Sequence, residues 1–218
     1  MNPDFAVARR RMVDGQVRTV DVTDMRVLEA FLDTPRELFL AGQDAALAYV
    51  DLDLEIAPGR HLVACGPLAR LVQAAAVTPN DVVLDVGCGS GYSACIFGHL
   101  ANSVIALEEN AALADAAEAA IAESTISNVA VVRGPLVDGW AAEAPFDLVF
   151  IGGAIGVIPE AIANQIRDGG RLIAVEGQGG AAVAKQWLKQ DGRLVGRRLF
   201  NCALPAMPGF AKKPEFVF

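Results

Sequence analysis

The most informative segment of the chain reads Asp81-Val82-Val83-Leu84-Asp85-Val86-Gly87-Cys88-Gly89-Ser90-Gly91-Tyr92. Four of the five residues from 82 to 86 are branched aliphatics, which is typical of a strand buried on both faces. Three glycines at a spacing of two follow directly, and residues 92–100 have a composition compatible with a helix. A strand, a tight glycine turn and a helix form the first half of a nucleotide-binding βαβ unit.

The glycine turn also indicates which ligand it binds. Its spacing is G-x-G-x-G, whereas a loop that seats a dinucleotide pyrophosphate has G-x-G-x-x-G, so an NAD-dependent dehydrogenase is disfavoured. Asp85, two residues before the first glycine, would repel a pyrophosphate and attract an ammonium group. The methionine end of S-adenosylmethionine carries such a group, so we expect this cofactor here. The expected contacts are Asp85, Gly87, Gly89, Ser90 and Gly91.

A pair of carboxylates, Glu108 and Glu109, ends the next apolar run at 104–107. Glu108 lies 21 residues beyond Gly87, the separation at which an acidic side chain binds ribose hydroxyls in such units. We therefore expect both carboxylates to take part in cofactor binding. The alternative is that Glu108 only ends the strand and caps the following helix.

The alternation of apolar runs and helix-compatible stretches predicts a Rossmann-like, doubly wound α/β fold with a mostly parallel seven-stranded sheet. Asp191-Gly192 is a strong two-residue turn, so the last two strands should form an antiparallel C-terminal hairpin. A helix is predicted at 159–167. The N-terminal third has no place in the sheet and should form a helical cap. We expect a single domain, 1–218, with the cap at 1–78 and the cofactor-binding core at 79–218.

The composition argues against several classes of function. The net charge of −8 argues against general binding of nucleic acid. No apolar run reaches the roughly 18 residues of a membrane span, and no secretory signal is visible. Four cysteines without a C-x-x-C pair, and only two histidines, argue against a metal site. We expect a cytoplasmic protein with reduced thiols and no membrane or nucleic-acid partner, while the oligomeric state stays open.

Segments from about residue 10 to 200 resemble the protein-L-isoaspartate O-methyltransferase family, which uses S-adenosylmethionine. The glycine turn is common to class I methyltransferases, whereas the ordered set of segments is much more specific. The resemblance implies that the chain methylates isoaspartyl carboxylates in damaged proteins, the start of their repair. Such an acceptor is already ionised, so alignment matters more than a general base. The matching segments are 26–31, 34–39, 48–49, 83–92, 128–129, 144–147 and 165–172.

Two segments depart from the family pattern. Where the family has Gly-Gln-Thr-Ile-Ser-Gln-Pro, residues 59–65 read Gly-Arg-His-Leu-Val-Ala-Cys. His61 and Val63 thus replace the threonine and serine whose hydroxyls line the acceptor and cofactor site. Where the family has Gly-Asp-Gly beside the adenine, this chain has Gly134-Pro135-Leu136. The resemblance therefore places Pro135 and Leu136 at the adenine, without the aspartate hydrogen bond.

His61 is the candidate catalytic residue. It could act as a base for a hydroxyl or amine acceptor, bind an anionic acceptor when protonated, or have no chemical role. Arg60 could pair with a substrate carboxylate or face solvent. Three functions stay open: isoaspartyl methylation, methylation of another carboxylate or a small molecule, and a catalytically inactive cofactor-binding module.

Overall fold

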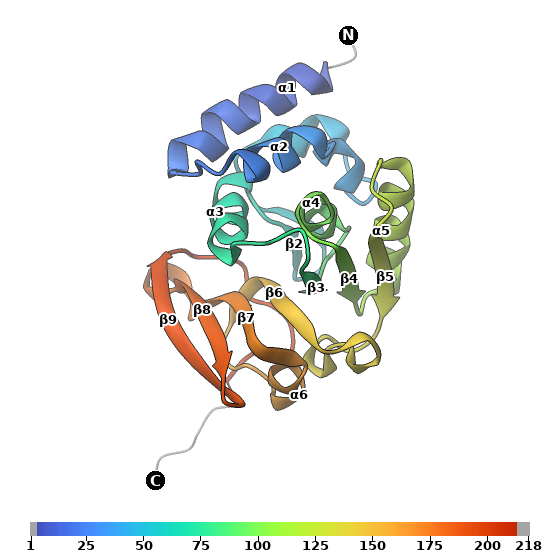
Figure 1. Ribbon diagram of the computed structural model, residues 1–218. Coiled ribbons are helices and arrows are strands. Elements are labelled where there is room, and N and C mark those ends of the chain that lie inside the picture. Colours follow the sequence, from blue (N-terminus) through green and yellow to red (C-terminus); the bar gives the residue numbers. More distant parts are fainter. Residues whose placement is uncertain (1–3, 213–218) are drawn as a thin grey trace.

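A seven-stranded sheet organises the fold, which a computed structural model describes for residues 4–212 (Figure 1). Its strands lie in the order β5-β4-β3-β6-β7-β8-β9; the first five are parallel, and β8 and β9 pair antiparallel. The predicted doubly wound α/β sheet with its C-terminal hairpin is thus confirmed. The strands are β3 (Val82–Val86), β4 (Ser103–Glu108), β5 (Val129–Arg133), β6 (Phe146–Ile155), β7 (Ile166–Glu176), β8 (Val183–Gln190) and β9 (Arg193–Asn201).

Helices cover both faces of this sheet. The first face carries α3 (Cys65–Ala75), α4 (Tyr92–Leu100) and α5 (Ala111–Glu123), whereas α6 (Glu160–Asn164) lies on the second (Figure 1). Successive strand residues point to opposite faces of the sheet. Val83 therefore packs in a first apolar layer, on the face that carries α3 and α4, and Leu84 packs in a second apolar layer, on the face that carries α6. Both layers are buried, which explains why the strands are continuous apolar runs.

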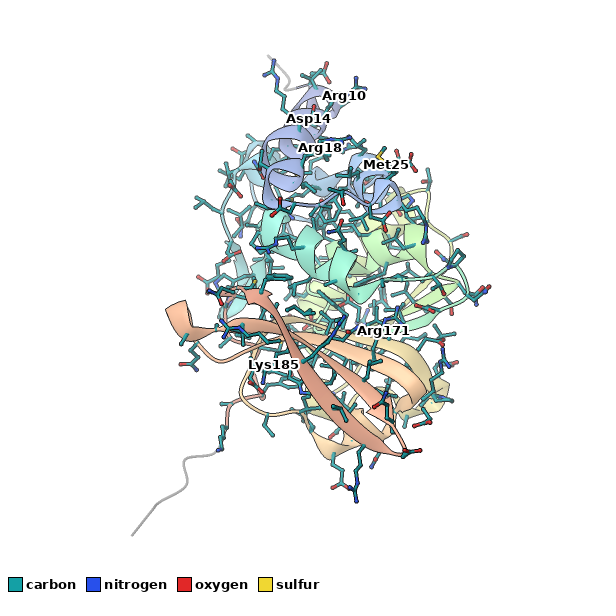
Figure 2. All side chains as sticks on the ribbon, turned by 60° about the vertical axis from the view of Figure 1, so that its left-hand side comes forward. Arg10, Asp14, Arg18, Met25, Arg171 and Lys185 are labelled. Carbon is teal, nitrogen blue, oxygen red and sulfur yellow. The ribbon has the colours of Figure 1, made fainter. Side chains whose placement is uncertain are left out.

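The N-terminal segment forms the predicted cap outside the first helical layer. It contains α1 (Phe5–Met12), which continues through helical turns at Val13–Val17 and Arg18–Val20, and α2 (Met25–Asp33) (Figure 1). The outer surface of this cap exposes the side chains of Arg10, Asp14 and Arg18 (Figure 2). Within residues 4–212, no helix has the length and apolar character needed to cross a bilayer.

Two segments from distant parts of the sequence reach the carboxyl end of β3. The first is a small antiparallel hairpin, β1 (Leu54–Ala57) and β2 (Arg60–Leu62), which lies outside the main sheet. The second follows β9 and returns along the end of β6, where the Met207 N–H donates to the Ala154 carbonyl at 2.8 Å. These two segments decide how much space remains above the glycine turn.

The helix predicted at 159–167 is too long at its C-terminal end. The carbonyl of Gln165 accepts a hydrogen bond from the Phe146 N–H at 2.8 Å, so strand pairing begins at Ile166. Residues 167–170 then form a bulge, because Phe146 pairs with Ile166 while Leu148 pairs with Arg171. The pair of glycines at 169–170 therefore belongs to β7.

Candidate cofactor site

The glycine turn lies at the carboxyl end of β3, between β4 and β6, where the strand order reverses. In doubly wound sheets this switch point is where ligands bind. Gly87, Gly89 and Gly91 have φ angles of 74°, 60° and 94°, in the left-handed region that favours glycine. The Gly87 N–H donates to the Leu107 carbonyl at 2.8 Å, which ties the turn to the end of β4. The predicted strand, turn and helix therefore form at the place expected for a ligand site.

Asp85 is fully buried just before the turn. Its Oδ2 accepts a hydrogen bond from Ser93 Oγ at 2.6 Å, while Oδ1 has no partner within residues 4–212. Burial raises the pKa of Asp85 to about 7; Ser93 and Arg60 oppose this change, and the negative charge of Glu108 adds to it. A buried carboxyl group with an unused acceptor atom is suited to a cationic group of a ligand.

Glu108 is also fully buried, and its partner is the side chain of Arg60 from β2. The guanidinium forms a bidentate ion pair with it, with Nη1–Oε1 and Nη2–Oε2 distances of 2.5 and 2.7 Å. Three main-chain N–H groups, of Gly89, Glu109 and Asn110, donate to the same carboxylate at 2.8–3.0 Å. Arg60 is therefore neither solvated nor directed at a substrate, the two roles considered for it from the sequence.

The Met207 side chain lies directly over the turn. A Cβ added to Gly87 would be 2.7 Å from Met207 Sδ and 3.2 Å from Arg60 Nη2. Two small cavities remain, of about 30 and 20 Å³, and both are lined by His61, Val63, Gly87 and Gly152. Each has room for one or two water molecules, whereas ligand pockets have volumes of about 300–1,000 Å³.

The other residues expected from the sequence surround this centre. The Ser90 hydroxyl is buried and donates to the Phe39 carbonyl, so only its main chain could serve a ligand. Glu109 and Pro135 are exposed, and Leu136 is buried in the second apolar layer. His61, on β2, is half-buried, and its Nδ1 has no partner within residues 4–212. In the same part of the chain, no three His, Cys, Asp or Glu side chains are arranged to hold a metal.

The site therefore has suitable chemistry for S-adenosylmethionine but does not accommodate it in this conformation. Asp85 and the turn provide the carboxylate and the glycine backbone that the cofactor requires. Arg60 occupies the acceptor atoms of Glu108, and Met207 occupies the space over Gly87. Sequence reasoning missed Met207, and it considered Arg60 only as a partner of a substrate carboxylate or as a solvated side chain. Arg60 had one signal, a cation where the family has a neutral glutamine, whereas no motif marked Met207.

A family model described as Protein-L-isoaspartate(D-aspartate) O-methyltransferase (PCMT) matches residues 9–206. A protein-L-isoaspartate O-methyltransferase from Koribacter versatilis is 35% identical over 205 residues, covering 94% of this chain and 92% of that protein. Its counterpart from Geobacter metallireducens is 32% identical over 207 residues, covering 94% and 96%.

Solved structures give the same fold. A protein-L-isoaspartate O-methyltransferase structure has a TM-score of 0.80 at 23% identity, covering 92% of this chain and 66% of that chain. A Plasmodium falciparum structure assigned to the same activity, in complex with S-adenosyl-L-homocysteine, has a TM-score of 0.75 at 20% identity, covering 91% and 97%. Since the family model matches most of the chain and both bacterial relatives are matched over nearly their whole length, this chain belongs to the protein-L-isoaspartate O-methyltransferase family of S-adenosylmethionine-dependent methyltransferases.

Proposed function

We propose that this chain transfers a methyl group from S-adenosylmethionine to the carboxylate of isoaspartyl residues in damaged proteins. The observation that carries the proposal is a glycine turn flanked by carboxylates at the switch point of the sheet, in a chain that matches the family over residues 9–206. The Plasmodium falciparum structure contains S-adenosyl-L-homocysteine, the product that remains after the donor loses its methyl group. That complex supports the choice of cofactor.

The proposed cofactor contacts are the residues expected from the sequence. Asp85 is supported by its unpartnered Oδ1, which a ligand ammonium group would satisfy. Glu108 is supported by its position at the end of β4, next to the turn, although Arg60 now occupies its oxygens. The full proposed set is Asp85, Gly87, Gly89, Ser90, Gly91, Glu108, Glu109, Pro135 and Leu136.

His61 is the residue we propose to contact the acceptor. Its side chain lines both cavities beside the turn, and its Nδ1 is free of hydrogen bonds within residues 4–212. An isoaspartyl carboxylate is already ionised, so His61 would bind or orient it rather than remove a proton. A second candidate function, methylation of a different carboxylate, is favoured by the replacement of two family hydroxyls by His61 and Val63.

We also propose that residues 1–218 act as one methyltransferase domain in the cytoplasm, with the cap at 1–78 and the core at 79–218. One cluster of buried apolar side chains includes Phe31 from the cap and Phe97 from the core, which supports a single unit. All four cysteines are free and buried, as is usual in a reducing compartment. Residues 1–3 and 213–218 of the proposed domain lie outside the described residues.

A methyl-transfer assay tests the proposed substrate. The full chain is incubated with tritiated S-adenosylmethionine and a peptide that contains one isoaspartyl residue. We expect label in this peptide and none in the same peptide with a normal aspartyl residue, because the acceptor carboxylate is positioned differently in the two. If S-adenosyl-L-homocysteine binds but neither peptide is labelled, isoaspartyl methylation is wrong. The chain would then methylate another acceptor or be a catalytically inactive cofactor-binding module.

A further inference from the structure

Arg60 and a cofactor ribose would compete for the same two oxygen atoms. The Glu108 carboxylate already accepts five hydrogen bonds, two from Arg60 and three from the main chain. A carboxylate offers about four lone-pair positions, so no acceptor capacity is left for ribose hydroxyls. Since Glu108 is fully buried, the ribose also has no path to it while Arg60 stays in place.

The three main-chain donors keep Glu108 satisfied when Arg60 leaves. The N–H groups of Gly89, Glu109 and Asn110 belong to the turn and to the end of β4, and none of them lies on the hairpin that carries Arg60. The side chain of Arg60 is buried, but the residue directly follows the exposed turn residues Pro58 and Gly59, so the hairpin turn beside it lies at the surface. The pair can therefore separate without loss of the fold around Glu108.

Met207 also blocks the site. Its Sδ is the atom nearest to a Cβ placed on Gly87, and its Cβ and Cε lie 3.1 Å from one placed on Gly153. The main chain of Met207 is bonded to Ala154, but its flexible side chain can change rotamer without breaking that bond. Two side chains from separate segments therefore cover the same glycine backbone.

We propose that Arg60 controls cofactor access: its ion pair with Glu108, supported by Met207, closes the site, and S-adenosylmethionine binds only to molecules in which this pair has separated. The inference rests on the proposed function, because it concerns the same site. The apparent affinity for the cofactor then equals the affinity of the open site multiplied by the fraction of molecules that are open. A glutamine at this position would be uncharged and shorter than arginine, and would leave the Glu108 oxygens accessible.

Isothermal calorimetry with S-adenosyl-L-homocysteine tests this on the full chain and on Arg60→Gln. We expect Arg60→Gln to bind about tenfold more tightly or better, because the variant removes the closed population. Met207→Ala should also bind more tightly, and the double variant most tightly. Met207→Ala carries the test alone if circular dichroism shows that Arg60→Gln is unfolded.

Arg171→Gln is the matched control. Arg171, on β7, also forms a largely buried ion pair with a carboxylate, from Nη2 to Asp81 Oδ2 at 2.6 Å, but this pair lies at the amino end of β3 (Figure 2). Its substitution should lower stability and leave the affinity for S-adenosyl-L-homocysteine unchanged.

Two results would overturn the inference. Equal, tight binding by the unmodified chain and Arg60→Gln would show that Arg60 does not limit access, and the proposed function would stand. No binding at millimolar ligand by the unmodified chain or by any folded variant would remove both the inference and the proposed function.

Discussion

Replacement of Glu108 by alanine is expected to lower the free energy of unfolding by about 3–5 kcal/mol. The substitution leaves the Arg60 side chain, which is 6% exposed, without its ion-pair partner, and leaves three main-chain N–H groups without an acceptor. In a domain of this size, such a loss lowers the melting temperature by roughly 10 °C. Urea unfolding followed by circular dichroism measures the change.

Glu109→Ala is the control for this experiment. Glu109 is the next residue and also a glutamate, but it is exposed, so its replacement should change stability by no more than about 0.5 kcal/mol. Adding Arg60→Met to Glu108→Ala should restore part of the lost stability, because the unpaired buried charge is then removed. A loss below about 1 kcal/mol for Glu108→Ala would show that the ion pair is not held as described.

The two partners of the ion pair are not equivalent. Glu108 retains three main-chain donors without Arg60, whereas Arg60 has no other acidic partner among the described residues. Removal of Arg60 should therefore be tolerated much better than removal of Glu108. This asymmetry is what a site that opens requires: the carboxylate stays fixed for the ligand, and the cation is the part that moves.

Local patterns in the sequence determined much of the fold. The buried strand at 82–86, the glycine spacing and the turn at Asp191-Gly192 each depend on neighbours within a few residues, so periodicity and turn chemistry reveal them. The end of the helix predicted at 159–167 was wrong because the Gln165 carbonyl accepts a hydrogen bond from the N–H of Phe146, which is 19 residues away in the sequence. Such a partner leaves no trace in the local pattern.

The closed state of the site escaped prediction for the same reason. Arg60 and Glu108 are 48 residues apart, and Met207 approaches Gly87 from the other end of the chain. The sequence placed the carboxylates and glycines at one sheet edge because parallel strands bring their carboxyl ends together. It could not show which side chains cover that edge, since this depends on how a hairpin and a C-terminal segment pack in three dimensions.

Asp85→Asn is expected to stabilise the protein above neutral pH by several kcal/mol and to have little effect near pH 4. Burial raises the pKa of Asp85 from 3.8 to about 7, so the folded state holds a proton that the unfolded state releases. The stability that this proton contributes is complete below the unfolded pKa and is lost as the pH rises from about 4 through about 7. Above about pH 7 the loss is on the order of 4 kcal/mol, and asparagine has no proton to lose. Urea unfolding of both proteins between pH 4 and pH 8 measures the difference.

Asp81→Asn should show the opposite pH dependence. Burial of Asp81 opposes ionisation, but the hydrogen bonds from Arg171 and Thr78 prevail and hold its pKa below the usual value. Its carboxylate therefore stabilises the fold above the unfolded pKa, and its replacement should lower the free energy of unfolding more as the pH rises through the acidic range.

A constant difference in the free energy of unfolding between Asp85→Asn and the unmodified chain at every pH would contradict the first prediction. It would show that Asp85 is not protonated in the folded state. A carboxyl group that lowers stability at neutral pH, at the carboxyl end of the strand whose amino end Asp81 stabilises, is best explained by a cationic ligand that restores its charge.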